Sequence, residues 1–432
     1  MKKLIFFVFA FFAFLMILPL YAQEAAIKEG ESLNLDRCVE IALKIHPTIE
    51  GSLYAIKARE AQLGQARANY FPKLDTSAGY LRNFEINNTL DPYSVLVMEQ
   101  YNNSTANATL YQRIYDFGRT PTNVDIKKLN LDSSRFDFSS NATTVTNNVK
   151  NSYYGVLKTQ RARNVTIETV NQFKQHLDQA KAMFYAGTKP KYDVIKAEVD
   201  LSNAQLNLIS AENDLKIAWV TLNNAMGIDS VAEYKIEDNL AFAKYELTME
   251  DALQKAYQNR PDLKSLVAQQ ESAQKSVELA KKEYYPLLTG NAQYNAGGSQ
   301  YPLGQGWQAG VNMSVNIFDG FSTTNKVAEA MANKRIIDAK INAMKLQIML
   351  DVKQAFLNLI KAVETISATE VQVMQATETL ELANLRYTSG LADPLEVTDA
   401  TVSYSNARLS NISALYDYKV SQANLEKAMG NK

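Results

Sequence analysis

Four stretches of the chain alternate apolar and polar residues with a period of two, which is typical of β-strands that have one apolar face. The clearest stretch has Trp307, Val311 and Ile317 on one side and Gln308 and Asn312 on the other. The other three stretches are 74–86, 106–114 and 288–296. We therefore expect two hairpins of long strands, at about 73–117 and 287–319.

The polar side of these strands is rich in amides and hydroxyls and carries few charges, as Asn291, Gln293 and Asn295 illustrate. A strand of a transmembrane barrel needs about 9–11 residues, with one face toward lipid and the other toward the lumen. A half-exposed sheet of a soluble domain has the same period, but its wet face usually carries more lysine and glutamate. The pattern favours a membrane barrel and leaves the soluble sheet as an alternative.

Each hairpin is followed by a very long stretch that contains almost no helix-breaking residues. Between Thr120 and Tyr185 the only proline and glycine are Pro121 and Gly155, and residues 322–387 contain neither. A helix of about 65 residues is roughly 100 Å long, which exceeds the diameter of a compact domain. We expect long helices at about 120–186 and 322–388 and partner helices at about 191–226 and 393–429, with a further helix before each hairpin.

The first partner helix carries two apolar stripes. The inner stripe alternates spacings of three and four, as coiled coils do, and consists of Ala197, Leu201, Ala204, Leu208, Ala211, Leu215, Ala218, Leu222 and Ala225. The outer stripe consists of Ile195, Val199, Leu206 and Ile209. A helix with two stripes contacts neighbours on two sides, as each helix does in a barrel of helices, whereas a surface helix has one apolar face.

The chain is written twice. Pro47 and Tyr70 recur as Pro261 and Tyr284, 214 residues later, and further on Gly187 recurs as Gly390 at an offset of 203. Two copies of about 200 residues are far longer than the units of solenoids or propellers. We expect two similar halves, 23–227 and 248–432, joined by an irregular acidic linker at 228–247.

The first 22 residues are predicted to be a secretory signal peptide. Met1-Lys2-Lys3 is basic, residues 4–18 are apolar, and Ala22 provides a small residue at the cleavage site. The apolar run is shorter than the roughly 20 residues that span a bilayer. The rest of the sequence has no second apolar run of that length, so entry into a membrane would require a closed β-barrel.

Charge and reactive residues argue against other functional classes. The 45 basic and 46 acidic residues give a net charge of −1, without the basic field that binds nucleic acid. Cys38 is the only cysteine, so no intrachain disulfide forms, and we expect a buried thiol. His46 and His176 are too isolated to be metal ligands, and no glycine-rich phosphate loop occurs. We therefore expect that the protein is not an enzyme and that it has neither a cofactor nor a metal site.

Together these features resemble the TolC-like outer-membrane efflux protein family, over nearly all of residues 31–430. The resemblance is carried by the doubled prolines, by Tyr70-Phe71-Pro72, and by Ile317-Phe318-Asp319-Gly320 before the second long helix. The most specific part is the turn 387–391 followed by 396–400. Each motif alone is weak, and their order, doubled at a fixed offset, is strong.

The resemblance implies an α+β membrane protein that is a homotrimer in the outer membrane. Each chain would supply four strands of a 12-stranded transmembrane β-barrel, continuous with a long α-helical barrel in the periplasm. Such a channel exports solutes passively, together with a periplasmic adaptor protein and an inner-membrane transporter. Drug efflux, metal efflux and type I protein secretion all remain open.

The resemblance also implies two groups of functional residues near the helix turns. The periplasmic gate would comprise Tyr387, Glu396 and Asp399, the two carboxylates lying one helical turn apart. The helix tips that dock the adaptor would comprise Gly187, Thr188, Lys189, Gly390, Leu391 and Ala392. The family has an arginine where this chain has Ala392, so the bonds that close the gate must differ, and Lys189, Lys191 or Lys196 could substitute.

Plainer interpretations of these residues remain. A glycine in a tip ends a helix, and carboxylates in the first turn of a helix are favoured by its dipole. A secreted structural or adhesive coiled-coil protein with a soluble sheet is the alternative function, and solubility without detergent would distinguish it.

Overall fold

The computed structural model describes residues 30–87, 97–229, 234–243, 245 and 247–431. The predicted signal peptide and parts of the predicted linker lie outside these residues. Within the described part, no helix has both the length and the apolar character needed to cross a membrane.

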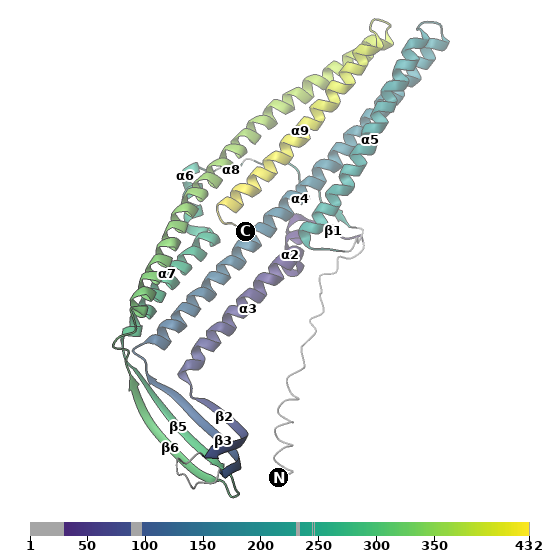
Figure 1. The fold of residues 1–432 in the computed structure, drawn as a ribbon. Helices are drawn as coiled ribbons and strands as arrows, with labels where there is room; N and C mark the ends of the chain where they lie inside the picture. The colour runs from purple at the N-terminus through teal and green to yellow at the C-terminus, as the bar shows by residue number, and fades with distance from the viewer. Residues whose placement is uncertain (1–29, 88–96, 230–233, 244, 246, 432) are drawn as a thin grey trace. The chain divides into compact units, whose positions relative to one another are not determined.

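The described elements follow the same order in both halves of the chain (Figure 1). The first half contains β1 (Ser32–Leu33), α2 (Leu35–Ile45), α3 (Pro47–Arg67), η1 (Ala68–Tyr70), β2 (Lys73–Asn87), β3 (Val97–Tyr115), α4 (Arg119–Tyr185) and α5 (Lys191–Met226). The second contains β4 (Lys235–Ile236), α6 (Met249–Asn259), α7 (Pro261–Lys281), η2 (Lys282–Tyr284), β5 (Leu287–Gly298), β6 (Gly304–Ser314), α8 (Ser322–Thr388) and α9 (Pro394–Ala428).

The chain forms two compact units, and each draws on both halves of the sequence. The first unit comprises the described residues up to Glu50 together with Val145–Ala243 and Ala362–Val420. The second unit comprises Gly51–Thr144, Lys244–Lys361 and Ser421–Lys432. The compact units therefore do not coincide with the two halves of the sequence, because the long helices α4 and α8 each contribute to both units.

In the first unit, Gly227 at the end of α5 lies against the break between α2 and α3 at Pro47. The Asn34 side chain caps α2 by accepting from the Arg37 N–H at 2.8 Å, and the helix ends before Pro47. Gly227 ends α5 with φ +76°, and a Cβ there would lie 2.9 Å from the His46 Cα. Pro47 separates α2 from α3, and Gly227 lets α5 end against that break. Cys38 of α2 is buried and free, which confirms the expectation for this thiol.

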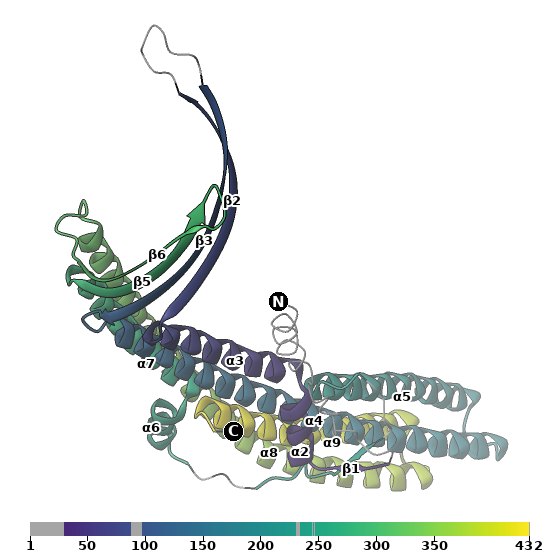
Figure 2. The same cartoon turned by 90° about the horizontal axis from the view of Figure 1, so that it is seen from below.

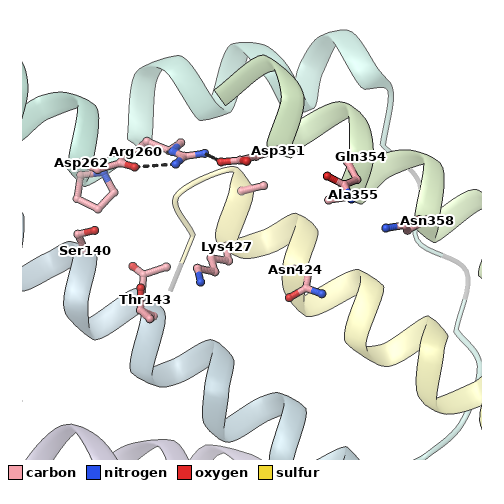
Figure 3. A pocket seen from close by; sticks show the side chains of 13 residues that line it. Ser140, Thr143, Arg260, Asp262, Asp351, Gln354, Ala355, Asn358, Asn424 and Lys427 are labelled. Atoms are coloured by element: carbon pink, nitrogen blue, oxygen red, sulfur yellow. Dashed lines mark hydrogen bonds and ion pairs between the residues drawn. The ribbon is translucent and has the colours of Figure 1, made fainter. Parts of the chain in front are cut away.

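The second unit repeats this arrangement and adds an ion-pair network around Arg260, at the break between α6 and α7. A Cβ on Gly430 would lie 2.7 Å from the backbone nitrogen of Arg260. The Arg260 guanidinium bonds both oxygens of Asp262, at 3.1 and 2.6 Å, and Asp351 of α8 at 2.8 Å. These groups line a polar cleft of about 380 Å³ that Lys427 of α9 also borders (Figure 3).

The sheet of the second unit is antiparallel in the order β2-β3-β5-β6, and its strands curve together (Figure 2). Its register places apolar residues on one face, in rows such as Leu74, Leu110, Ala292 and Ala309, then Thr76, Ala108, Tyr294 and Trp307. The other face carries rows such as Asp75, Thr109, Gln293 and Gln308, then Ser77, Asn107, Asn295 and Gly306. Amide side chains bond across that face, for example Gln308 Nε2 to Gln293 Oε1 at 2.9 Å.

The second hairpin ends earlier than the alternation predicts. β6 stops at Ser314, and Ile317 lies beyond the strand with 94% of its surface exposed. The reason is the turn that follows, in which Asp319 accepts from the N–H of Thr323 at 2.9 Å and thereby caps the start of α8. Asp116 makes the equivalent bond to Thr120 at 2.7 Å ahead of α4.

Candidate functional site at the helix tips

The candidate site lies in the first unit, where α4 turns into α5 and α8 turns into α9 (Figure 1). Gly187 and Gly390 have φ values of +74° and +76°, the left-handed conformation that glycine adopts without strain. Each turn carries the paired bonds of a Schellman ending. The bond of each pair that spans five residues joins the Thr188 N–H to the Met183 carbonyl at 3.0 Å and the Leu391 N–H to the Arg386 carbonyl at 2.9 Å.

Each helical hairpin packs through a small apolar cluster at matching positions. In the first hairpin the buried residues are Leu177, Ala180 and Ala197, and in the second they are Leu380, Ala383 and Ala400. These sets are 203 residues apart, which is the offset of the sequence repeat. Alanine at the contacts lets the helix backbones approach closely.

Tyr387 lies between the two hairpins and is fully buried. It packs with Ala392 and Val397 of its own hairpin and with Met183 of α4. Its ring centroid lies 4.8 Å from that of His176, and the Lys189 Nζ lies 5.5 Å from the ring centroid. Burial raises the pKa of the Tyr387 hydroxyl, and the charge of Asp193 raises it further. We call this contact between α4 and α8 the tip joint.

A second connection between the hairpins runs through Asp200 of α5, which is only 6% exposed. Its carboxylate accepts from the Thr398 hydroxyl of α9 at 2.9 Å and from the Lys196 Nζ at 2.5 Å. Because both groups are buried, breaking the bond to Thr398 would leave one oxygen of the Asp200 carboxylate without its hydrogen bond, while Lys196 still holds the other oxygen.

Two of the lysines considered as substitutes for the missing arginine have defined partners. Lys189 donates to the Ala392 carbonyl at 3.4 Å and so links the two tips, whereas Lys196 bonds Asp200 instead. The Ala392 side chain is buried beneath Tyr387. We therefore expect Ala392 to support the turn and to offer little surface to a partner.

Glu396 and Asp399 are exposed near the start of α9, whereas Tyr387, the third predicted gate residue, is buried. Asp393 caps that helix by accepting from the N–H groups of Leu395 and Glu396 at 2.9 and 3.1 Å. Glu396 also forms an ion pair with Arg386 at 3.0 Å. Because both of these side chains are substantially exposed, the pair adds little stability.

The tip residues differ in how much surface they present. Leu391 is 74% exposed, and Gly187, Thr188 and Gly390 are exposed as well. Leu391 is therefore the large apolar side chain that this turn presents to solvent. Among the described residues, no group of three or more histidine, cysteine, aspartate or glutamate side chains is placed to hold a metal ion.

The structure adds residues that the sequence reasoning missed. His176 is 4% exposed, and burial lowers the pKa of its imidazole, while the charges of Asp200 and Asp193 act in the opposite direction. Its signal in the sequence was its position, because it lies three or four residues from Phe173 and Ala180 on one apolar stripe of α4. Asp200 likewise lies between Ala197 and Ala204. A polar residue on such a stripe indicates a buried polar contact.

Comparison with known proteins agrees with this architecture. The family model of outer membrane efflux proteins matches residues 38–228 and 252–431. The outer membrane protein TolC of Escherichia coli K12 is 22% identical over 421 residues, which is 93% of this chain and 83% of that protein. The protein CyaE of Bordetella pertussis is 23% identical over 402 residues, which is 88% of this chain and 81% of that protein.

The fold is shared with solved channel structures. The CmeC outer membrane channel of Campylobacter jejuni has a TM-score of 0.80 and 18% identity, covering 96% of this chain and 90% of that one. The family model accounts for most of the sequence, and the helix turns and four-stranded sheet form the same fold as these channels. The chain belongs to the outer membrane efflux protein family.

Proposed function

We propose that this protein is the outer-membrane channel of a tripartite efflux pump or of a type I secretion system. It exports solutes passively after an inner-membrane transporter delivers them through a periplasmic adaptor protein. Its strands lie in the outer membrane and its helices in the periplasm. Membership of the outer membrane efflux protein family and likeness to TolC and CyaE support this assignment.

The observation that carries the proposal is the chemistry of the two faces of the sheet. Trp307, Val311 and Met313 on the apolar face are 78%, 63% and 70% exposed in the single chain. In water this exposure is unfavourable, and in a bilayer the same face contacts lipid. The amide-rich opposite face suits a water-filled lumen.

The edges of the sheet indicate how a barrel would close. In the described part of the chain, β2 and β6 each pair on one side only. Unpaired strand edges are not tolerated in lipid, and a single sheet of four strands is too narrow to close on itself. We propose that three copies join edge to edge into a 12-stranded barrel.

The helices support the same assembly. On α5 the outer stripe is exposed, with Leu206 and Ile209 at 62% and 64%. At 100° per residue these side chains point away from Ala204, which is buried. An apolar stripe on the free side of a paired helix is covered when neighbouring chains complete an α-helical barrel.

We also propose that the chain consists of two tandem repeats, 23–227 and 248–432, that follow a signal peptide at 1–22. The caps Asn34 and Thr248, and the buried glycine contacts at each copy's end, support a duplicated structure. N-terminal sequencing of the exported protein would test the cleavage site.

In this trimer, Glu396 and Asp399 form two stacked acidic rings that favour cations at the periplasmic gate, and Tyr387 holds the two hairpins together behind them. The exposed tip residues, with Leu391 foremost, dock the adaptor. Because Arg386 forms an ion pair with Glu396, this arginine is a further candidate for gate control.

Conductance in planar bilayers tests the proposal. Purified protein should give small, cation-selective steps that a millimolar multivalent cation blocks from the helical side. The E396Q/D399N double variant should weaken that block by roughly tenfold or more, because every carboxylate of the two rings loses its charge. The matched control is E378Q/E381Q, which removes two exposed carboxylates of α8 away from the turn.

Two outcomes would contradict parts of this proposal. Equal loss of block in both double variants would leave a channel but place its gate elsewhere. Protein that does not conduct and stays soluble without detergent would contradict the membrane channel. That second result would favour a secreted structural coiled-coil protein.

A further inference from the structure

The tip joint contains buried polar groups that its packing leaves unpaired. Within the described residues, both ring nitrogens of His176 and the hydroxyl of Tyr387 are buried without a hydrogen-bond partner. The two rings are tilted at 56° with their centroids 4.8 Å apart, and they come from different hairpins, α4 and α8. Buried polar atoms without partners are rare in folded proteins and call for an explanation.

The surroundings of His176 are charged but already partly neutralised. From α5, Asp193 and Asp200 act on the imidazole through their charges, and Lys196 pairs with Asp200. From α8 the facing group is Tyr387, with the Lys189 ammonium near its ring. α9 contributes the uncharged Thr398, which donates to Asp200.

We propose that His176 is a proton-sensitive contact that holds the two hairpins together in its neutral form and releases them when protonated. The inference rests on the proposed channel function, because the two hairpins that meet here carry the proposed gate. It assigns a regulatory role in gating to a residue outside the gate itself.

The physical reason is the difference between the two forms of the ring. A neutral imidazole packs against Tyr387 at the cost of unpaired nitrogens. An imidazolium carries a charge and two N–H donors, and burying these without acceptors costs far more. Hydrating the charged ring requires α4 to separate from α8, so proton uptake and opening of the joint favour each other.

The direction of the pH effect follows. In an open joint the hydrated imidazole titrates near its ordinary pKa of 6.5, whereas burial in the closed joint lowers that pKa despite the nearby carboxylates. Above pH 6.5 both states hold a neutral ring and the closed joint keeps its full stability. As pH falls below this value the open joint binds the proton first, so acid favours opening.

The test compares channel opening at pH 7.5 and pH 5.5 on the helical side of a planar bilayer. Wild type should open more at the lower pH, on the order of fivefold, the low end of coupling between linked sites. The H176F variant keeps an aromatic ring without a titrating group and should lose most of this difference, as should H176Q. The control is H46N, which removes the other histidine but keeps an acceptor for the Thr48 N–H that His46 now bonds.

A second measurement does not depend on conductance. Limited proteolysis of the tips should be faster at pH 5.5 than at pH 7.5 in wild type and independent of pH in H176F. An unchanged pH response of H176F and H176Q in both measurements would overturn the inference while the channel function stands. If no variant conducts, the channel proposal fails and proteolysis alone decides the role of the histidine.

Discussion

Four glycines at the ends of long helices share nearly the same backbone conformation and differ in what surrounds them. Gly227 and Gly430 have φ values of +76° and +77° and press against the backbone of the residue before a proline. Gly187 and Gly390, at +74° and +76°, have open space for at least 4 Å around the position that a Cβ would occupy. The first pair therefore serves packing as well as the turn, and the second pair serves the turn alone.

Alanine substitution should separate these two roles. G227A and G430A should each destabilise the protein by several kcal/mol. About 1–2 kcal/mol arises from left-handed strain and about 1–3 kcal/mol from overpacking. G187A and G390A should lose the strain component only. Denaturant midpoints measured in detergent check this order, and G64A, inside α3 with open space around it, should be neutral or stabilising.

Equal losses at all four glycines would contradict this assignment. In that case the contacts with His46 and Arg260 would contribute nothing, and the repeated glycines would be explained by their backbone conformation alone.

At the scale of the element, the strands show what a period of two means for this chain. Val311 and Asn312 are neighbours in β6 and point to opposite faces of the sheet. Val311 belongs to the apolar face, and the Asn312 amide bonds Asn291 of β5 at 3.3 Å on the other. Both side chains are exposed in the single chain, so burial alone does not distinguish them.

An arginine at each position should distinguish lipid from lumen. V311R should sharply reduce the amount of assembled protein in the outer-membrane fraction, because arginine facing lipid near the bilayer centre costs about 2–4 kcal/mol. N312R should assemble and shift the ion selectivity toward anions. Similar recovery of both variants would mean that the two faces have the same surroundings, as in a soluble sheet.

At the scale of the whole molecule, each compact unit combines pieces of both halves of the sequence, so neither half is a separate domain. Some of the exposed apolar residues lie in a continuous stripe along one helix. On α5 the outer stripe continues through Ile217 and Val220, which are 55% and 67% exposed. A continuous stripe of this kind indicates association with another copy, since scattered apolar residues on a surface need no such explanation.

The L206S/I209S double variant should weaken or abolish the trimer while each chain keeps its helical content. The reason is loss of apolar area at a contact between chains, with no change to the buried inner stripe. The mass of the protein–detergent complex, measured by light scattering, checks the assembly, and circular dichroism checks the fold. Q205S, an exposed change on the same turn, should remain trimeric.

Local pattern was enough to predict most elements of this chain. The long helices begin and end at Arg119–Tyr185 and Ser322–Thr388, against expected ranges of 120–186 and 322–388. Helix breakers and turn-forming glycines act within a few residues, so their effects can be read along the chain. For β6 the alternation predicts an end at Ile317, whereas the strand ends at Ser314 and the chain enters the turn that Asp319 caps.

The sequence by itself determined the two periodicities, the doubled order of elements and the resemblance to a family. The periodicities and turn signals are properties of residues close together in the chain, and the doubled order and the resemblance follow from comparing such stretches along the sequence. Only the tertiary structure decided that His176 meets Tyr387, that Asp200 bonds Thr398 and that Ala392 is buried. An apolar stripe specifies which face of a helix is covered. Which side chains then meet across two helices depends on their relative rotation and shift, and packing between distant segments sets both.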